Sequence, residues 1–342
     1  TPTIQSPSIF SSESFVNSKV VLCVAIMFLW PFDVKCISIS VYIRFLNNHL
    51  FFNSMIERFE NGELIPEKEW VSYIEELEKK SNKSTKEEVK QAIIDAVKKR
   101  IPKKQFGVFF SGGVDSTLLA FICKQNNADF VCYSVGLKDS PDIVIGKEVA
   151  KILGLKLVQK TFTLEELHEL FKKTCKILKN PDILSVGVGS VIIAAAELGK
   201  KDGIDTFFGG LGSEEIFAGY ERHSKADDVH AECWRGLKSM WQRDFNRDFD
   251  VATAMKIKVL VPFLDDDLII KAMGIPAERK VSDTQRKIIL REIAEYLGLP
   301  KQFAWREKKA AQYGSRFDKS MDKLATQHGF STKMKYLGSL TT

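Results

Sequence analysis

The sequence predicts an α/β protein in which a parallel sheet is covered by helices on both faces and is followed by a helical C-terminal part. Two observations support this fold class. Between residues 105 and 210, short strand-like segments alternate with helix-like segments of about 10 to 15 residues, the pattern of parallel strands joined by helical crossovers. Beyond about residue 212 the strand-like segments end and only helix-like sequence follows.

Four segments have the composition of buried strands. They are rich in aromatic and β-branched residues and are bounded by turn residues, as strands in the interior of an α/β protein are. These segments are residues 106–110, 129–135, 155–162 and 205–208.

Capping residues mark the expected helix starts. Ser84 and Glu87 form a capping-box pair ahead of an apolar stripe, which predicts an amphipathic helix over 84–100. Thr163 and Glu166 predict a second helix in the same way. Further helices are expected from Ser116, from Pro141 and over residues 185–198.

The composition is that of a globular protein, because 44% of the 342 residues are apolar and 27% are charged. A formal net charge of +6 over this length permits a polyanionic ligand such as ATP or RNA without requiring one. We expect no DNA partner, and the modest charge and the lack of a recognisable RNA-binding module argue against an RNA partner. The six cysteines show no C-x-x-C spacing, so we expect neither zinc nor a disulfide framework, and a reducing, cytoplasmic location.

The first 54 residues differ from the rest of the chain. They contain only five charged side chains, and their apolar run from Val20 to Trp30 is eleven residues long and ends at Pro31. A membrane-spanning helix needs about 20 apolar residues. We expect an extension ahead of a globular chain that begins at Met55, and a membrane-proximal anchor is the alternative.

The turn after the first expected strand reads SGGVDS and has the composition of a phosphate-binding loop. Gly112 and Gly113 permit positive φ and close approach of a ligand, so that successive N–H groups can bind an anion at the start of the next helix. The hydroxyls of Ser111 and Ser116 can donate to phosphate oxygens. A carboxylate beside a phosphate most simply binds Mg²⁺, the role expected for Asp115. The alternative is a tight turn without a ligand.

This loop resembles the pyrophosphate-binding loop of the PP-loop ATP pyrophosphatases, and further segments resemble the synthetase domain of the asparagine synthetase family. The resemblance covers about 60% of the chain, in the family's order. It implies a PP-loop fold of the adenine nucleotide alpha hydrolase type, with ATP and Mg²⁺ as cofactors. The resembling segments are YSVGLKDSPDIVIGKEVAKILG (133–154), FFGGLGSEEIFAGYER (207–222), VPFLDDDLIIKAM (261–273) and WREKKAAQYG (305–314).

The resemblance also implies roles for single residues. Lys308 approaches the α-phosphate and acts with Asp115 in catalysis, while Asp115 and Glu214 bind Mg²⁺. The backbone at the strand ends holds adenine and ribose, and the SGGVDS loop holds the β- and γ-phosphates. The cofactor-binding residues implied in this way are Phe110, Ser111, Gly112, Gly113, Asp115, Ser116, Val135, Gly136, Gly209 and Gly210.

Some positions depart from the family pattern. Glu214 replaces an aspartate and keeps the carboxylate, whereas Leu211 stands where the family usually has an acid. Lys258 and Leu260 replace a glutamate and an arginine, and a leucine cannot bind a carboxylate or phosphate through paired hydrogen bonds. The nucleotide half of the site is therefore retained and the acceptor half is altered, so the acceptor, aspartate or another carboxylate, stays open.

We expect an AMP-forming ligase of the asparagine synthetase type, acting on a small-molecule carboxylate. Residues 55–104 are too few for the family's glutaminase domain, so the nitrogen is expected from free ammonia, a separate glutaminase subunit or an amine. Two alternatives stay open: an ATP-dependent enzyme that modifies tRNA or nucleobases, and an inactive nucleotide-binding regulator.

The expected organisation has four parts, and we expect the protein to be a homo-oligomer. The parts are an extension at 1–54, a helical segment at 55–104, an asparagine synthetase-like ATP pyrophosphatase domain at 105–325 and a tail at 326–342.

Overall fold

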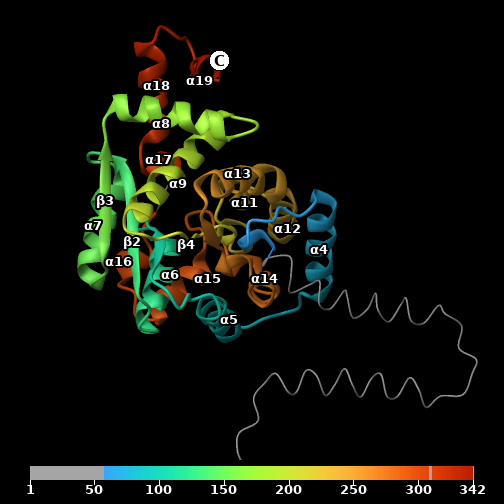
Figure 1. Cartoon of the computed structure of the whole chain (residues 1–342). Helices are drawn as coiled ribbons and strands as arrows, with labels where there is room; N and C mark the ends of the chain where they lie inside the picture. The colour runs from blue at the N-terminus through green and yellow to red at the C-terminus, as the bar shows by residue number, and fades with distance from the viewer. Residues whose placement is uncertain (1–57, 308–309, 342) are drawn as a thin grey trace, which may run out of the picture. The chain divides into compact units, whose positions relative to one another are not determined.

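A computed structural model describes residues 58–307 and 310–341, which belong to one compact unit, Asn53–Thr342 (Figure 1). The expected extension at 1–54 and the predicted catalytic Lys308 lie outside the described residues. The division of the chain into four parts stays a prediction.

A five-stranded parallel sheet with the order β3-β2-β1-β4-β5 forms the centre of the fold. The first four strands confirm the four predicted segments. β5 shows that the prediction of no strand beyond residue 212 is wrong. The sequence does not reveal this strand, because it has only three residues, begins with a lysine and is defined by its pairing with β4. The strands are β1 (Phe106–Phe109), β2 (Phe130–Leu137), β3 (Leu157–Phe162), β4 (Thr206–Phe208) and β5 (Lys258–Leu260).

Helices cover both faces of this sheet, as predicted. α6 and α7 connect β1 to β2 and β2 to β3, and the right-handed crossover rule places them on one face. The connection from β3 back to β4 runs in the opposite direction across the sheet, so α9 covers the other face and packs on β2 (Figure 1). These helices are α6 (Val114–Gln125), α7 (Pro141–Leu153), α8 (Leu164–Ile177) and α9 (Ile183–Lys201).

The helix α9 belongs to the protein core. In the described part of the chain it alone has the length and apolar composition of a membrane span, yet half of that window is buried inside the fold. A side chain at Gly199 would lie 2.5 Å from Cζ of Phe207, so glycine allows α9 to approach β4 closely. Ile193, Ala195 and Ala196 are buried in the same apolar cluster as Phe207.

The capping boxes are only partly as predicted. Thr163 and Glu166 cap α8 as expected. The box of α5 is formed by Thr85 and Glu88, one residue later than predicted, because the Thr85 hydroxyl accepts the hydrogen bond from the backbone N–H of Glu88. α6 begins at Val114 rather than at Ser116, because Gly113 is its N-cap.

Most other elements are helical. α18 and α19 pack back onto α8 and α9, and Tyr336 and Leu337 are buried in the core there. These elements are α4 (Glu67–Lys80), α5 (Lys86–Lys98), α10 (Ser213–Ile216), α11 (Glu221–Ser224), α12 (Val229–Met240), the π-helical η1 (Trp241–Phe245), α13 (Asn246–Met255), η2 (Pro262–Leu264), α14 (Asp266–Met273), η3 (Ala277–Arg279), α15 (Ile288–Tyr296), α16 (Lys301–Ala304), α17 (Ala311–Gly314), α18 (Phe317–Gln327) and α19 (Lys333–Leu340).

Candidate functional site

The SGGVDS loop forms a tight connection between β1 and α6 at the carboxyl edge of the sheet. Gly112 has φ +66°, and a side chain there would lie 3.0 Å from the backbone nitrogen of Gly146. Glycine is therefore required by both conformation and space. The two serines face one another, with 3.2 Å between the hydroxyl oxygens of Ser111 and Ser116. The loop thus presents hydroxyls and the start of an α-helix at one place, the arrangement that binds anions.

The predicted nucleoside-binding residues lie at neighbouring strand ends. The backbone N–H of Phe110 donates to the carbonyl oxygen of Tyr133 at 2.8 Å, which extends the pairing of β1 and β2 past the end of β1. Val135 and Gly136 follow on β2. A side chain at Gly136 would meet the Ser140 hydroxyl at 2.3 Å, so this position has no room for one.

The second glycine block, after β4, reaches the loop. The N–H of Gly209 donates to the carbonyl oxygen of Leu260 at 2.9 Å. A side chain at Gly210 would lie 3.4 Å from Cβ of Asp115. Two segments about a hundred residues apart in the sequence therefore meet where the open end of a parallel sheet binds ligands.

Asp115 and Glu214 converge on a lysine that the sequence analysis did not identify. The Nζ atom of Lys287 lies 2.8 Å from Oδ1 of Asp115 and 2.8 Å from Oε1 of Glu214. It also donates to the hydroxyl of Ser213 at 3.0 Å. Lys287 precedes α15, has φ +57° and is buried, with 4% of its surface exposed. Three separate segments thus form one charged cluster around a buried ammonium group.

The charge of Lys287 is retained because of its two partners. Burial by itself lowers the pKa of an ammonium group, but Asp115 and Glu214 outweigh this effect, and the pKa of Lys287 is raised.

The two carboxylates fit a divalent cation. Their oxygens already converge on one positive charge, the Lys287 ammonium, from two different elements, α6 and α10. Carboxylate oxygens are preferred ligands of Mg²⁺, which takes one or two of them together with phosphate oxygens and water. Asp115 and Glu214 are therefore the residues of this site that could hold Mg²⁺ beside the phosphate loop.

Glu215 does not join this cluster. It is fully buried and forms an ion pair with Arg243, which also binds Asp244 at 2.7 Å. Burial and the neighbouring Asp244 raise the pKa of Glu215 to about 7. The adjacent acids therefore have different surroundings: Glu214 faces Lys287 beside the loop, and Glu215 lies in the protein interior with Arg243.

The three positions that depart from the family pattern, Leu211, Lys258 and Leu260, lie near the open end of the sheet or in β5. Leu211 is half-buried beside Gly210, at the open end of the sheet. Lys258 is half-buried, and its ammonium group donates to Oδ1 of Asn61 at 3.1 Å. Leu260 is buried, and its carbonyl oxygen accepts the hydrogen bond from the N–H of Gly209. The side chain at residue 260 itself therefore carries no charge.

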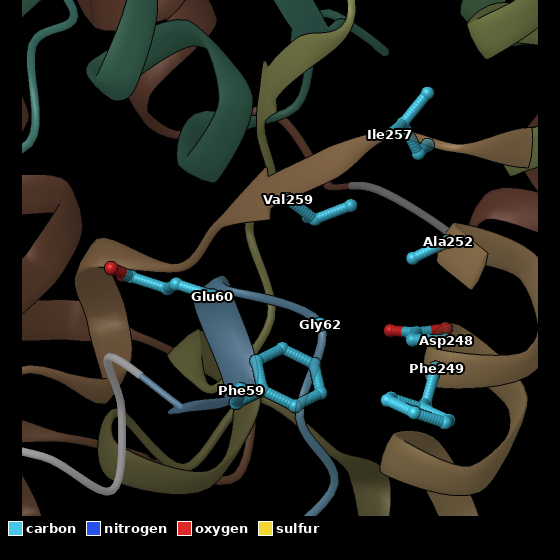
Figure 2. Close-up of a pocket in the computed structure, with 8 residues that line it drawn as sticks. All are labelled: Phe59, Glu60, Gly62, Asp248, Phe249, Ala252, Ile257 and Val259. Carbon is cyan, nitrogen blue, oxygen red and sulfur yellow. The ribbon is translucent and has the colours of Figure 1, made fainter.

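A small hollow lies beside β5 and α13, and Figure 2 shows its lining. Its volume of about 10 Å³ is room for one water molecule and not for a nucleotide. The candidate site is therefore the carboxyl edge of β1, β2 and β4 and not this hollow. The lining residues are Phe59, Glu60, Gly62, Asp248, Phe249, Ala252, Ile257 and Val259.

Comparisons with known proteins find similar sequence along most of this chain. A family model described as asparagine synthase matches residues 88–228 and 221–335. A glutamine-hydrolyzing asparagine synthetase homologue from Methanocaldococcus jannaschii is 30% identical over 333 residues, covering 86% of this chain and 59% of that protein. Asparagine synthetase B of Escherichia coli is 30% identical over 249 residues, covering 67% of this chain and 45% of that protein. The chain thus spans about half the length of these relatives.

Among solved structures, the NMN synthetase of Francisella tularensis aligns with 75% of this chain and 93% of its own. That alignment has a TM-score of 0.39 and 12% sequence identity.

Proposed function

Because the chain belongs to the asparagine synthase family, we propose that it is an ATP-dependent carbon–nitrogen ligase that adenylates a carboxylate and releases pyrophosphate. The observation that carries this proposal is the meeting of Asp115, Glu214 and Lys287 beside a glycine loop at the start of α6. A cluster of this kind suits the β- and γ-phosphates of ATP with their cation, because it offers both metal-binding carboxylates and a buried ammonium group.

In the proposed binding mode, the nucleotide lies across the carboxyl edge of the sheet. The backbone around Phe110, Val135 and Gly210 holds adenine and ribose, with Gly136 and Gly209 lining the same region. The N–H groups and hydroxyls of the SGGVDS loop bind the phosphates. Mg²⁺ held by Asp115 and Glu214 would neutralise charge on the departing pyrophosphate.

The proposed reaction has two steps. A carboxylate oxygen of the acceptor attacks the α-phosphorus, the bond to the oxygen that bridges to the β-phosphate breaks, and pyrophosphate leaves. Ammonia or an amine then attacks the acyl carbon of the adenylate, AMP leaves, and the nitrogen loses a proton. Lys308 is proposed to stabilise the charge that develops on the α-phosphate oxygens, a role worth about 10² to 10³ in rate for one fixed donor.

The acceptor half of the site limits what can bind. Leu211 and Leu260 offer no charge to an acceptor, so aspartate would lack the acid and the arginine that the family usually places there. We therefore propose a carboxylate whose group next to Leu211 is uncharged. Its nitrogen donor is proposed to be ammonia, from solution or from a glutaminase, because the relatives are named as glutamine-hydrolyzing enzymes. A cytoplasmic location and a homo-oligomer stay predictions.

Pyrophosphate release from MgATP tests the function directly. The protein is incubated with separate pools of carboxylic acids, of amines with carboxylic acids, and of tRNA. We expect release with the carboxylic acid pools. Release with the tRNA pool alone would favour a nucleic-acid-modifying enzyme, and no release with any pool would favour a nucleotide-binding regulator.

Asp115→Asn is the matched control for this assay, because the amide keeps the shape of the side chain and loses the charge that binds a cation. We expect it to abolish Mg²⁺-dependent release and to remain folded, as monitored by circular dichroism. Retention of most of the activity at saturating Mg²⁺ would show that Asp115 is not a metal ligand.

A further inference from the structure

The phosphate loop is contacted by an arginine from the other end of the chain. The Nη2 atom of Arg306 donates to the carbonyl oxygen of Gly112 at 3.2 Å. Gly112 is the loop residue with positive φ, so this contact reaches the tightest point of the turn. The loop lacks the lysine of a P-loop, and Arg306 therefore brings to it a cation that its own sequence does not supply.

Arg306 has donor capacity to spare at this position. Its Nε atom is buried and has no hydrogen-bond partner within residues 58–307 and 310–341. A guanidinium group has five N–H donors in a fixed plane and binds phosphate oxygens in pairs. A buried donor beside an anion-binding loop is the kind of group that a phosphate would satisfy.

A second arginine holds the backbone on both sides of Trp305. The Nη1 atom of Arg291, on α15, donates to the carbonyl oxygens of Ala304 and Arg306 at 2.8 and 2.9 Å. Its Nε atom donates to the carbonyl oxygen of Arg286 at 2.7 Å. Arg291 is 6% exposed and, in the described part of the chain, all of its hydrogen bonds go to backbone carbonyls.

This arrangement has a clear reason in the local sequence. α16 is only four residues long, and its last carbonyls have no partners within the helix. Arg291 supplies a partner for the carbonyl oxygen of Ala304, the last residue of α16, and also binds the carbonyl oxygen of Arg306, which fixes the segment that carries Arg306. Arg291 follows Lys287 by four residues, so the start of α15 contacts both the acidic pair and this segment.

We propose that Arg306 is a phosphate-binding residue of the nucleotide site, and that Arg291 is the positioning residue that holds it against the loop. The inference rests on the proposed function only in taking the ligand of the loop to be a nucleoside triphosphate. The competing view is that both arginines simply hold loops together, and it predicts lost stability without a coupled loss of affinity.

Equilibrium binding of the Mg²⁺ complex of α,β-methylene-ATP, measured by calorimetry, separates the two views. The analogue cannot be cleaved between its α- and β-phosphates, so no acceptor and no turnover are needed. Arg306→Met should weaken binding about tenfold to a hundredfold, because a charged hydrogen-bonding partner of the phosphates is lost. Arg306→Lys should keep part of the affinity, because the charge remains and the planar donor pair does not.

Arg291→Met should weaken binding through Arg306 alone. The double variant with Arg306→Met should therefore bind no more weakly than Arg306→Met, a non-additive result that a purely structural role does not give. Arg291→Lys should restore part of the affinity. Arg279→Met is the matched control, because it removes an arginine that pairs with Glu292 of α15 at the surface and should leave binding unchanged.

Two results would overturn the inference while leaving the proposed function standing. One is binding by Arg306→Met as tight as that of the unmodified protein. The other is a double variant whose loss of affinity is the product of the two single losses. Failure of the unmodified protein itself to bind the analogue would instead overturn the proposed function together with this inference. If Arg291→Met does not fold, the pair Arg306→Met and Arg306→Lys still decides the phosphate contact.

Discussion

Two lysines seven residues apart in the sequence are both buried and have opposite surroundings. Lys287 lies between Asp115 and Glu214, and its pKa is raised. Lys280 is completely buried, and within the described residues the one hydrogen bond of its ammonium group goes to Sδ of Met273, at 3.5 Å. Burial lowers the pKa of Lys280 to about 8. The two lie close together, because the backbone N–H of Ile288 donates to the carbonyl oxygen of Lys280 at 2.9 Å.

The two lysines differ in whether a carboxylate lies within reach of the buried ammonium group. An unpaired ammonium group in the interior is strongly disfavoured, whereas one held by carboxylates is retained. Lys287 is therefore a lasting positive charge at the phosphate loop, and Lys280 is a group close to losing its proton. The first arrangement suits the binding of an anion and a metal, and the second lowers the stability of the folded protein at neutral pH.

The largest expected effect is that of Lys287→Met. It leaves Asp115 and Glu214 beside one another without a cation, and breaking a buried pair costs about 3–5 kcal/mol. For a protein of this size we expect the melting temperature to fall by about 4 to 8 °C in the absence of Mg²⁺. Millimolar Mg²⁺ should restore part of the loss, because it can replace the ammonium group between the carboxylates.

Differential scanning calorimetry with and without Mg²⁺ checks this expectation. Lys258→Met is the control, since it removes a lysine that makes only an exposed hydrogen bond to Asn61. A melting temperature of Lys287→Met close to that of the control would show that the two carboxylates do not depend on Lys287.

Lys280→Met should raise the stability of the folded protein, whereas Lys287→Met lowers it. The pKa of Lys280 is about 8 in the folded protein, and that of an unfolded lysine is about 10.4. The unfolded chain therefore binds more protons between these pH values, and stability rises with pH across this window, by about 3 kcal/mol for this one group. The methionine variant lacks this rise and should be the more stable protein at pH 7.

Urea unfolding of both proteins at pH 7 and at pH 10 gives the measurement. The comparison is between the two differences in unfolding free energy, so that other groups titrating in the same range cancel. An equal pH dependence in the two proteins would show that Lys280 has an ordinary pKa.

The smallest effect is expected for Glu214→Asp, which installs the acid that the family usually has at this position. The carboxylate is retained and its reach is one methylene shorter, so the contact with Lys287 weakens without being lost. We expect a change in melting temperature of a few degrees and a change of a few-fold in the Mg²⁺ concentration for half-maximal pyrophosphate release. A loss as large as that of Asp115→Asn would show that the longer side chain is essential here.

The sequence predicted the parts of the fold and site that follow from local patterns. Four strands were found because their apolar segments are four residues or longer or lie beside glycine turns. β5 was not, because Lys258 begins it and only pairing with β4 defines it. Both Ser84-Glu87 and Thr85-Glu88 fit a capping box, and an apolar stripe does not distinguish starts one residue apart.

The charged cluster shows the same limit. The sequence allows the closeness of Asp115 and Gly210 to be predicted, because both follow strands of one parallel sheet and the carboxyl ends of such strands share one edge. The place of Lys287 in the cluster could not be predicted, because it lies among other charged side chains in the segment QRKIILRE and is expected to be a solvated residue. The role of Arg291 could not be predicted from the sequence either, because its partners are backbone carbonyl oxygens and no side-chain pattern marks them.

The most direct test of the account is to identify the nucleotide produced from ATP labelled in the α-phosphate. The protein is incubated with Mg²⁺, ammonia and the acceptor pool that supports pyrophosphate release, and the labelled products are separated by chromatography. We predict labelled AMP in equal amount to pyrophosphate, with Asp115→Asn producing neither. Labelled ADP with inorganic phosphate would contradict it, because the bond between the β- and γ-phosphates would then be the one cleaved.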